Sequence, residues 1–173
     1  MEPEPVTLLD VRDVAPAACE VISHFEHDFA AVLAGIEVHH IGATSLPFGH
    51  TKGDVDVNVR VREDAFVPLV AALGDRLREA QRENWTPTFA SFSSSEYALP
   101  LGIQVTAIGS PDDFLLALRD RMRADPELLR RYDEAKLAAA SAGAEAYWSA
   151  KDALLREVLY RITGSADRLE RRP

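Results

Sequence analysis

The segment from Asp54 to Val61 alternates strictly between polar residues and valine. Successive side chains of a β-strand point to opposite faces of a sheet, so this alternation predicts a strand with a valine face and a polar face. The valine face holds Val55, Val57, Val59 and Val61, and the polar face holds Asp54, Asp56, Asn58 and Arg60. The rest of the chain has to supply the partners of this strand.

Strands and helices mix in the first two thirds of the chain, and only helices follow. Apolar spacing predicts strands over 6–9, 36–41, 88–99 and 102–108. Helical spacing predicts helices over 16–33, 63–82, 112–124, 126–141 and 144–162. The prolines after Ser110 and Asp125 mark two of the helix starts. The order predicts one α+β domain over residues 1–173, with a helical C-terminal portion over about 111–163.

The composition is that of a soluble globular protein, with 47% hydrophobic and 27% charged residues among 173. No run of about 18 apolar residues and no signal-peptide pattern is present, so we expect no membrane partner and a cytoplasmic location. The net charge of −9 disfavours general nucleic-acid binding, because an acidic surface repels phosphate backbones.

The single cysteine, Cys19, excludes an internal disulfide and a cysteine-based zinc site. It falls in the first predicted helix, and we expect it to be a small core residue. The basic C-terminal segment 165–173 is expected to be a frayed tail.

The two carboxylates at the start of the alternating strand suggest a metal site. Asp54 and Asp56 are two residues apart, so their Cβ atoms point the same way at a separation of roughly 6.5–7 Å. Such a pair can share Mg²⁺ or Mn²⁺, which take oxygen ligands and also hold substrate phosphates. The alternative is a strand whose acids simply face water, and the spacing alone leaves this alternative open.

The loop before the strand adds a second signal. Gly42, Ala43, Thr44 and Ser45 follow a predicted strand, and glycine with hydroxyls and free N–H groups suits phosphate binding. Gly42-Ala43, ten residues and then Asp54-Val55-Asp56-Val57 resembles the signature of the DNA polymerase β-like nucleotidyltransferase superfamily. A Walker-type Gly-Lys-Ser/Thr loop is missing, which argues against a P-loop enzyme.

A narrower resemblance covers nearly the whole chain. The stretch His40-Ile41-Gly42-Ala43-Thr44-Ser45-Leu46-Pro47, followed by Lys52 and Asp56, resembles the hallmark of the GrpB family. The later stretches at 118–123 and 132–136, with Tyr147 and Lys151, are also similar to that family. The resemblance implies a nucleotidyltransferase-like fold, in which a mixed sheet is flanked by helices.

The chain departs from both patterns at several positions. In the GrpB register Asp56 is the first motif acid, with Asn58 at the second position. Active nucleotidyltransferases usually carry a third acid on a later strand, but the segment 102–108 has Gln104 and Thr106 at the candidate positions. Glu96 is a possible substitute. A missing third acid weakens a two-metal mechanism, because that acid usually serves as the base.

Four basic residues are candidates for phosphate contacts: Lys52, Arg119, Lys136 and Lys151. The three helical ones share stripes with apolar residues, and burying a cation is costly unless it is paired or its stem reaches solvent. They either converge on a phosphate-binding cleft or pair with acids such as Asp120, Asp133 or Asp152. For His40 we expect a structural, hydrogen-bonding role.

The function that the resemblance implies is metal-dependent nucleotidyl transfer to an acceptor that the sequence does not identify. Asp54 and Asp56 would be the catalytic and metal-binding acids, with Mg²⁺ or Mn²⁺ as cofactor. Gly42, Thr44 and Ser45 would cradle the phosphates of a nucleotide or another phosphorylated small molecule, and the basic residues would balance the charge. The alternative is a catalytically inactive domain that binds nucleotide or phosphate, or that serves as an interaction module.

Overall fold

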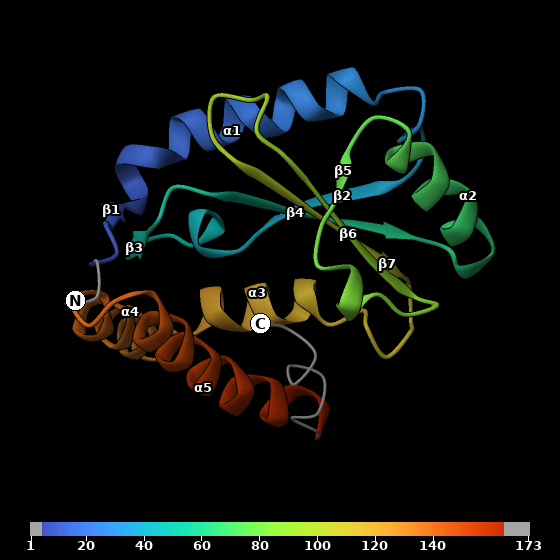
Figure 1. Ribbon diagram of the computed structural model, residues 1–173. Coiled ribbons are helices and arrows are strands. Elements are labelled where there is room, and N and C mark those ends of the chain that lie inside the picture. The colour runs from blue at the N-terminus through green and yellow to red at the C-terminus, as the bar shows by residue number, and fades with distance from the viewer. Residues whose placement is uncertain (1–4, 165–173) are drawn as a thin grey trace.

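The computed structural model describes residues 5–164, which form three layers. Helices α1 (Val11–Asp28) and α2 (Glu63–Gly74) cover one face of a five-stranded sheet. Helices α3 (Leu115–Ala124), α4 (Pro126–Ala140) and α5 (Ala144–Thr163) lie on the other side, as Figure 1 shows. The predicted α+β class, a mixed sheet flanked by helices with a helical C-terminal portion, is confirmed.

The main sheet has the strand order β2-β4-β7-β6-β5. Its strands are β2 (Glu37–Ile41), β4 (Val55–Val61), β7 (Leu101–Ala107), β6 (Phe89–Ser94) and β5 (Arg78–Glu79). The alternating strand β4 pairs antiparallel with β2 and parallel with β7, while β6 pairs antiparallel with both β7 and β5. A second, two-stranded sheet joins β1 (Leu9–Asp10) to β3 (His50–Thr51). Short 3₁₀ helices, η1 (Ala43–Ser45) and η2 (Arg82–Asn84), follow β2 and β5.

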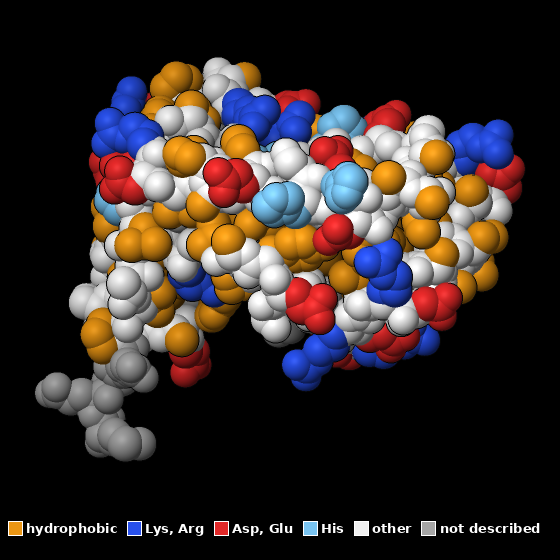
Figure 2. All heavy atoms as spheres, turned by 90° about the horizontal axis from the view of Figure 1, so that it is seen from above, with side chains coloured by type: hydrophobic (Ala, Val, Ile, Leu, Met, Phe, Trp, Pro, Cys, Tyr) orange, Lys and Arg blue, Asp and Glu red, His pale blue; other side chains and the backbone are white. Residues whose placement is uncertain are grey.

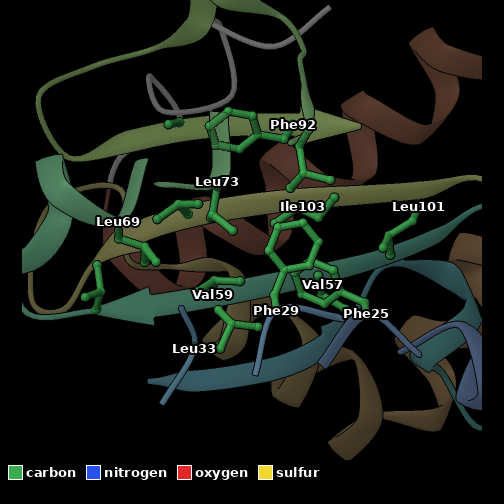
Figure 3. Close-up of a cluster of buried hydrophobic side chains, with 14 of the residues drawn as sticks. Phe25, Phe29, Leu33, Val57, Val59, Leu69, Leu73, Phe92, Leu101 and Ile103 are labelled. Atoms are coloured by element: carbon green, nitrogen blue, oxygen red, sulfur yellow. The ribbon is translucent and has the colours of Figure 1, made fainter. Parts of the chain in front are cut away.

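The valine face of β4 lies in the main core, as the alternation predicts. Each of its four valines is at most 4% exposed, and they contact α1 through Phe25 and α2 through Leu73. Figure 3 shows Val57 and Val59 of this face with Phe25, Leu73, Ile103 of β7 and Phe92 of β6. Each fully buried valine stabilises the fold by about 1.5–3 kcal/mol relative to exposure.

Several predicted boundaries are wrong for identifiable reasons. Helix α1 begins at Val11 rather than at 16, because the Asp10 side chain accepts a hydrogen bond from the Arg12 N–H and caps it. Helix α2 ends at Gly74 rather than at 82, and β5 follows in what was expected to be helix. The predicted start after Ser110 is also wrong, since turns precede α3 at Leu115. Asp125, in contrast, caps α4 through the Leu128 N–H, as predicted.

Cys19 is exposed on α1, so its expected core position is wrong. The apolar periodicity of the helix instead places the neighbouring residue Ala18 in the core, where it is fully buried. The segment 165–173 lies outside the described residues. Among the helices of residues 5–164, none is long and apolar enough to cross a membrane. On the face that Figure 2 shows, acidic and basic side chains are interspersed.

Candidate functional site

The polar face of β4 continues across the whole sheet. The pairing register aligns Asp56 with Ile41 of β2 and Gly102 of β7, then with Ser93 of β6 and Arg78 of β5. Residues paired directly across neighbouring strands point to the same face of a sheet. This row, which we call the Asp56 row, therefore faces the side of the sheet that carries the C-terminal helices.

The Asp56 carboxylate is held between two glycines. A Cβ atom built on Gly42 would lie 2.6 Å from Asp56 Oδ2, and one built on Gly102 would lie 2.5 Å from Oδ1. Gly42 also has a φ of +72°, which L-residues with side chains rarely adopt. The Gln104 Nε2 donates to Asp56 Oδ1 across 3.4 Å. Both glycines are thus needed for the carboxylate to take this position.

A cavity of about 380 Å³ lies between part of the sheet and the C-terminal helices. Asp54, Asp56 and Gln104 line its polar wall. Its apolar wall includes Ile41, Leu46, Phe114, Leu115, Leu118, Tyr132, Trp148 and Leu155. A ligand with an apolar or aromatic part beside a charged part matches this division.

Two lysines approach the ring of Trp148, which lines this cavity; Lys151 also lines it, whereas Lys52 is not among the lining residues. The Lys52 Nζ lies 4.2 Å from the ring centroid and the Lys151 Nζ lies 4.7 Å from it, both within cation–π range. Lys52 is also 3.9 Å from the Asp54 carboxylate. Lys151 has no hydrogen bond or ion pair within the described residues, so the alternative of pairing with Asp152 is not found for it.

Burial lowers the pKa of the Lys151 ammonium, and the Asp56 and Asp54 carboxylates act in the opposite direction. Lys52 adds to the lowering, because a second cation disfavours the protonated form. An anionic ligand beside the Lys151 ammonium would offset both effects, because a negative charge favours the protonated form. Burial also raises the pKa of the Tyr132 phenol, which lines the same cavity.

The hydroxyls of the Gly42–Ser45 loop are used within the protein. The Thr44 Oγ1 lies 2.9 Å from His40 Nε2, and the Ser45 hydroxyl donates to the Gly42 carbonyl at 2.7 Å. Both side chains are buried, while Gly42 lines the cavity. Gly42 therefore lies beside the acids, whereas the hydroxyls of Thr44 and Ser45 make hydrogen bonds that stabilise η1. The structural role expected for His40 is found, and burial lowers its pKa to about 4.

Two of the four candidate cations have protein partners. Arg119 lines the cavity, donates to the His40 carbonyl, and pairs with Asp120 at 2.7 Å. Lys136 is buried away from the cavity lining, where it donates to the His50 carbonyl and lies 3.7 Å from Asp133. The alternative of structural pairing with acids is thus found for Arg119 and Lys136.

The donor set of the cavity fits a hard divalent cation. Proteins hold Mg²⁺ through one or two carboxylates, with waters and substrate phosphates as the other ligands. Asp54 and Asp56 provide such a pair. Within residues 5–164 no group of three or more His, Cys, Asp or Glu side chains is arranged to hold a metal ion, so Glu96 does not join the two aspartates in a three-carboxylate metal site there.

Sequence reasoning missed three residues of the site: Gly102, Trp148 and Ser93. A glycine inside a strand pattern signals a close approach by another group, and Gly102 carried that signal. Trp148 lies beside the expected Tyr147 and Lys151, but one helix position away from their stripe. Ser93 carried no signal, because its place in the Asp56 row depends on strand pairing.

The fold and the cavity define a mixed α/β protein with a pair of strand acids in a cleft. A family model described as "GrpB protein" matches residues 10–161. The UPF0157 protein VC_A0354 of Vibrio cholerae serotype O1 is 34% identical over 152 residues, which cover 85% of this chain and 79% of the relative. This chain therefore belongs to the GrpB family.

A solved structure shares the fold. The crystal structure of the conserved protein GrpB from Enterococcus faecalis superposes with a TM-score of 0.68, covering 90% of this chain and 99% of that one. The two sequences are 20% identical over the match. The layered arrangement is therefore common to both proteins.

Proposed function

We propose that this chain binds a nucleoside triphosphate in the cleft and transfers its nucleotidyl group to the hydroxyl of an acceptor. The observation that carries the proposal is the position of the Asp56 carboxylate, which is fixed between Gly42 and Gly102 in the polar wall of the cavity. Asp54 and Lys151 line the same cavity. The acids match the metal counter-ion of a nucleotide, the cations match its phosphates, and the apolar wall matches its base.

In the proposed reaction the acceptor oxygen attacks the α-phosphorus and forms a new P–O bond. The bond between the α-phosphorus and the bridging oxygen breaks, and pyrophosphate leaves with the bonding pair. Asp54 and Asp56 would hold Mg²⁺ or Mn²⁺, which when bound stabilises the negative charge that develops on the phosphate oxygens. Lys52 and Lys151 lie where they add positive charge beside Trp148.

The proton of the acceptor hydroxyl leaves to solvent in this scheme. Gln104 and Thr106 lie at the strand positions considered for a third acid, and an amide or a hydroxyl is a poor general base. We therefore expect slow turnover.

The test of binding is calorimetric titration with each of the four common ribonucleoside triphosphates in the presence of Mn²⁺. The wild type is expected to bind at least one of them, and Asp54→Asn combined with Asp56→Asn to lose that binding while remaining folded. The matched control is Glu63→Gln with Asp64→Asn, which removes two exposed acids at the start of α2. Equal affinity in the wild type and the double variant at 54 and 56 would eliminate this metal site.

The test of turnover is incubation of labelled nucleotide with a mixture of hydroxyl-bearing acceptors. Slow transfer that depends on Asp54 and Asp56 supports the proposal, whereas binding without any transfer assigns the chain to the inactive, phosphate-binding alternative. Fast transfer in a Glu96→Gln variant would contradict the expectation of slow turnover, because another residue would then be acting as the base.

A further inference from the structure

The two carboxylates can be reached from a second side. A groove of about 480 Å³ lies at the end of the sheet where β4 and β7 begin and β6 ends. Asp54, Asp56, Ser93 and Gly102 line both this groove and the cleft described above. The cleft and the groove therefore share the two carboxylates, while most of their other lining residues differ.

The groove differs from the cleft in chemistry. The cleft has an apolar and aromatic wall, whereas the groove is lined by two arginines, three consecutive serines and Glu96. The arginines are Arg76 and Arg78, and the serines are Ser93, Ser94 and Ser95. Guanidinium groups and hydroxyls together suit the oxygens of a phosphate, because arginine binds them through two parallel hydrogen bonds.

The two arginines are placed for such a contact in different ways. Arg76 is fixed, since its Nη1 donates to the Asp28 carbonyl at 2.7 Å and its guanidinium lies 4.3 Å from the centre of the Phe29 ring. Arg78 belongs to the Asp56 row, where it pairs with Ser93. In the described part of the chain the Arg78 side chain has no hydrogen bond or ion pair, so its donors are available.

We propose that the groove binds the phosphate group of the acceptor, and that the acceptor is a phosphorylated small molecule with a free hydroxyl. This rests on the proposed function, because it assigns the second substrate of that reaction. A phosphate held by Arg76, Arg78 and the serines directs the hydroxyl toward Asp54 and Asp56. The donor nucleotide occupies the cleft, so the two substrates reach the acids from different sides, as displacement at phosphorus requires.

The test uses the full chain labelled with ¹⁵N, without metal or nucleotide, and glycerol 3-phosphate as the probe. We expect saturable shifts of the backbone amide signals of residues 78 and 93–96, and no shifts with glycerol. Arg78→Gln should weaken the affinity by about tenfold or more, as expected for loss of a hydrogen bond to a charged group. Arg62→Gln is the matched control, because Arg62 is an exposed arginine at the far end of β4 whose partner is Asp64. It should leave the affinity unchanged.

Three results would overturn the proposal. The first is no binding of glycerol 3-phosphate, and the second is equal binding by the wild type and Arg78→Gln. The third is a set of shifts centred on Lys52 and Lys151, which would place the phosphate in the cleft. Because this titration contains no nucleotide, the groove can bind phosphate even if nucleotide binding fails, and the reverse holds as well.

A second titration, with Mg²⁺ and a nucleotide that binds, tests the relation between the two sites. Glycerol 3-phosphate should still shift residues 93–96 when the nucleotide is saturating. Complete displacement of the probe by nucleotide would contradict the proposal, since both would then occupy one site.

Discussion

The two faces of the central sheet carry side chains of opposite character, because one face is apolar and the other is polar. On the side of α1 and α2, the β4 side chains are valines packed against aromatic and aliphatic residues. On the side of the C-terminal helices, the same strand presents Asp56, Asn58 and Arg60, and its neighbours add Gln104 and Ser93. Tight apolar packing on one face stabilises the sheet, so the other face can hold polar groups around a cavity.

The largest expected effect on stability comes from placing a polar side chain on the apolar face of β4, and the adjacent position on the polar face provides the comparison. Val57→Asn should lower the free energy of unfolding by about 3–5 kcal/mol, since it loses buried apolar area and leaves an amide unpaired in the core. Asp56→Asn, one residue away on the cavity side, should cost little. Urea unfolding measures both, and equal losses would show that the two faces contribute alike.

On the side of the C-terminal helices, Lys136 of α4 should make the free energy of unfolding depend on pH. Burial lowers the pKa of this ammonium from 10.5 to about 8, so between these pH values the unfolded chain keeps a proton that the folded chain has released. The free energy of unfolding therefore rises with pH in this window, by up to about 3 kcal/mol. Lys136→Met should abolish that rise.

Urea unfolding of the wild type and Lys136→Met at about pH 7 and about pH 10 gives the comparison. Leu137→Met is the control, because it changes an exposed neighbour on the same helix and removes no titrating group. A pH-independent difference between the wild type and Lys136→Met would contradict the shifted pKa.

Gly102→Ala tests how closely the Asp56 carboxylate is fitted. The added methyl group would meet Asp56 Oδ1 at 2.5 Å, so the carboxylate has to move. We expect a loss of about 1–3 kcal/mol in the free energy of unfolding, together with weaker Mn²⁺ binding. Gly74→Ala is the control, because its methyl group would meet Phe92 at an ordinary 3.7 Å and should change stability by less than about 1 kcal/mol. Unchanged metal binding in Gly102→Ala would show that the glycine is not needed for the acid.

The smallest effect on stability is expected for Lys151→Met. The variant removes a half-buried cation without an ion-pair partner in residues 5–164, so the free protein should be as stable as the wild type or more stable. Nucleotide affinity should fall by roughly 1.5–3 kcal/mol. Arg161→Met, at an exposed position on the same helix, is the control. A destabilised variant with unchanged affinity would refute the phosphate role of Lys151.

Much of the fold was predictable because local patterns determine it. The strict alternation of 54–61 identified the central strand and both of its faces, and the proline after a capping Asp125 identified the start of α4. The end of α2 was missed because the apolar stripe continues to Leu77, which is buried in the connection after Gly74. The apolar periodicity of a sequence indicates which residues are buried. A buried residue in a loop can therefore continue the pattern beyond the end of the helix.

The site was predictable only where its residues are close in sequence. Gly42, Asp54 and Asp56 follow from one loop and one strand. The cavity also needs Trp148 and Lys151 from α5, and the groove needs Ser93 and Arg78 from β6 and β5. These contacts depend on strand order and helix docking, which a single sequence does not report.

Two lysines lie beside the Trp148 ring, so the fluorescence of this residue can report on the charge in the cleft. The chain has two tryptophans, and Trp85 lies elsewhere, donating to the Ala80 carbonyl and packing against Phe92. A Trp85→Phe variant would therefore emit only from the cleft. Indole emission responds to charges beside the ring, so neutralisation of Lys52 and Lys151 by a bound phosphate should change its wavelength. Every candidate ligand could then be screened by fluorescence, without a label.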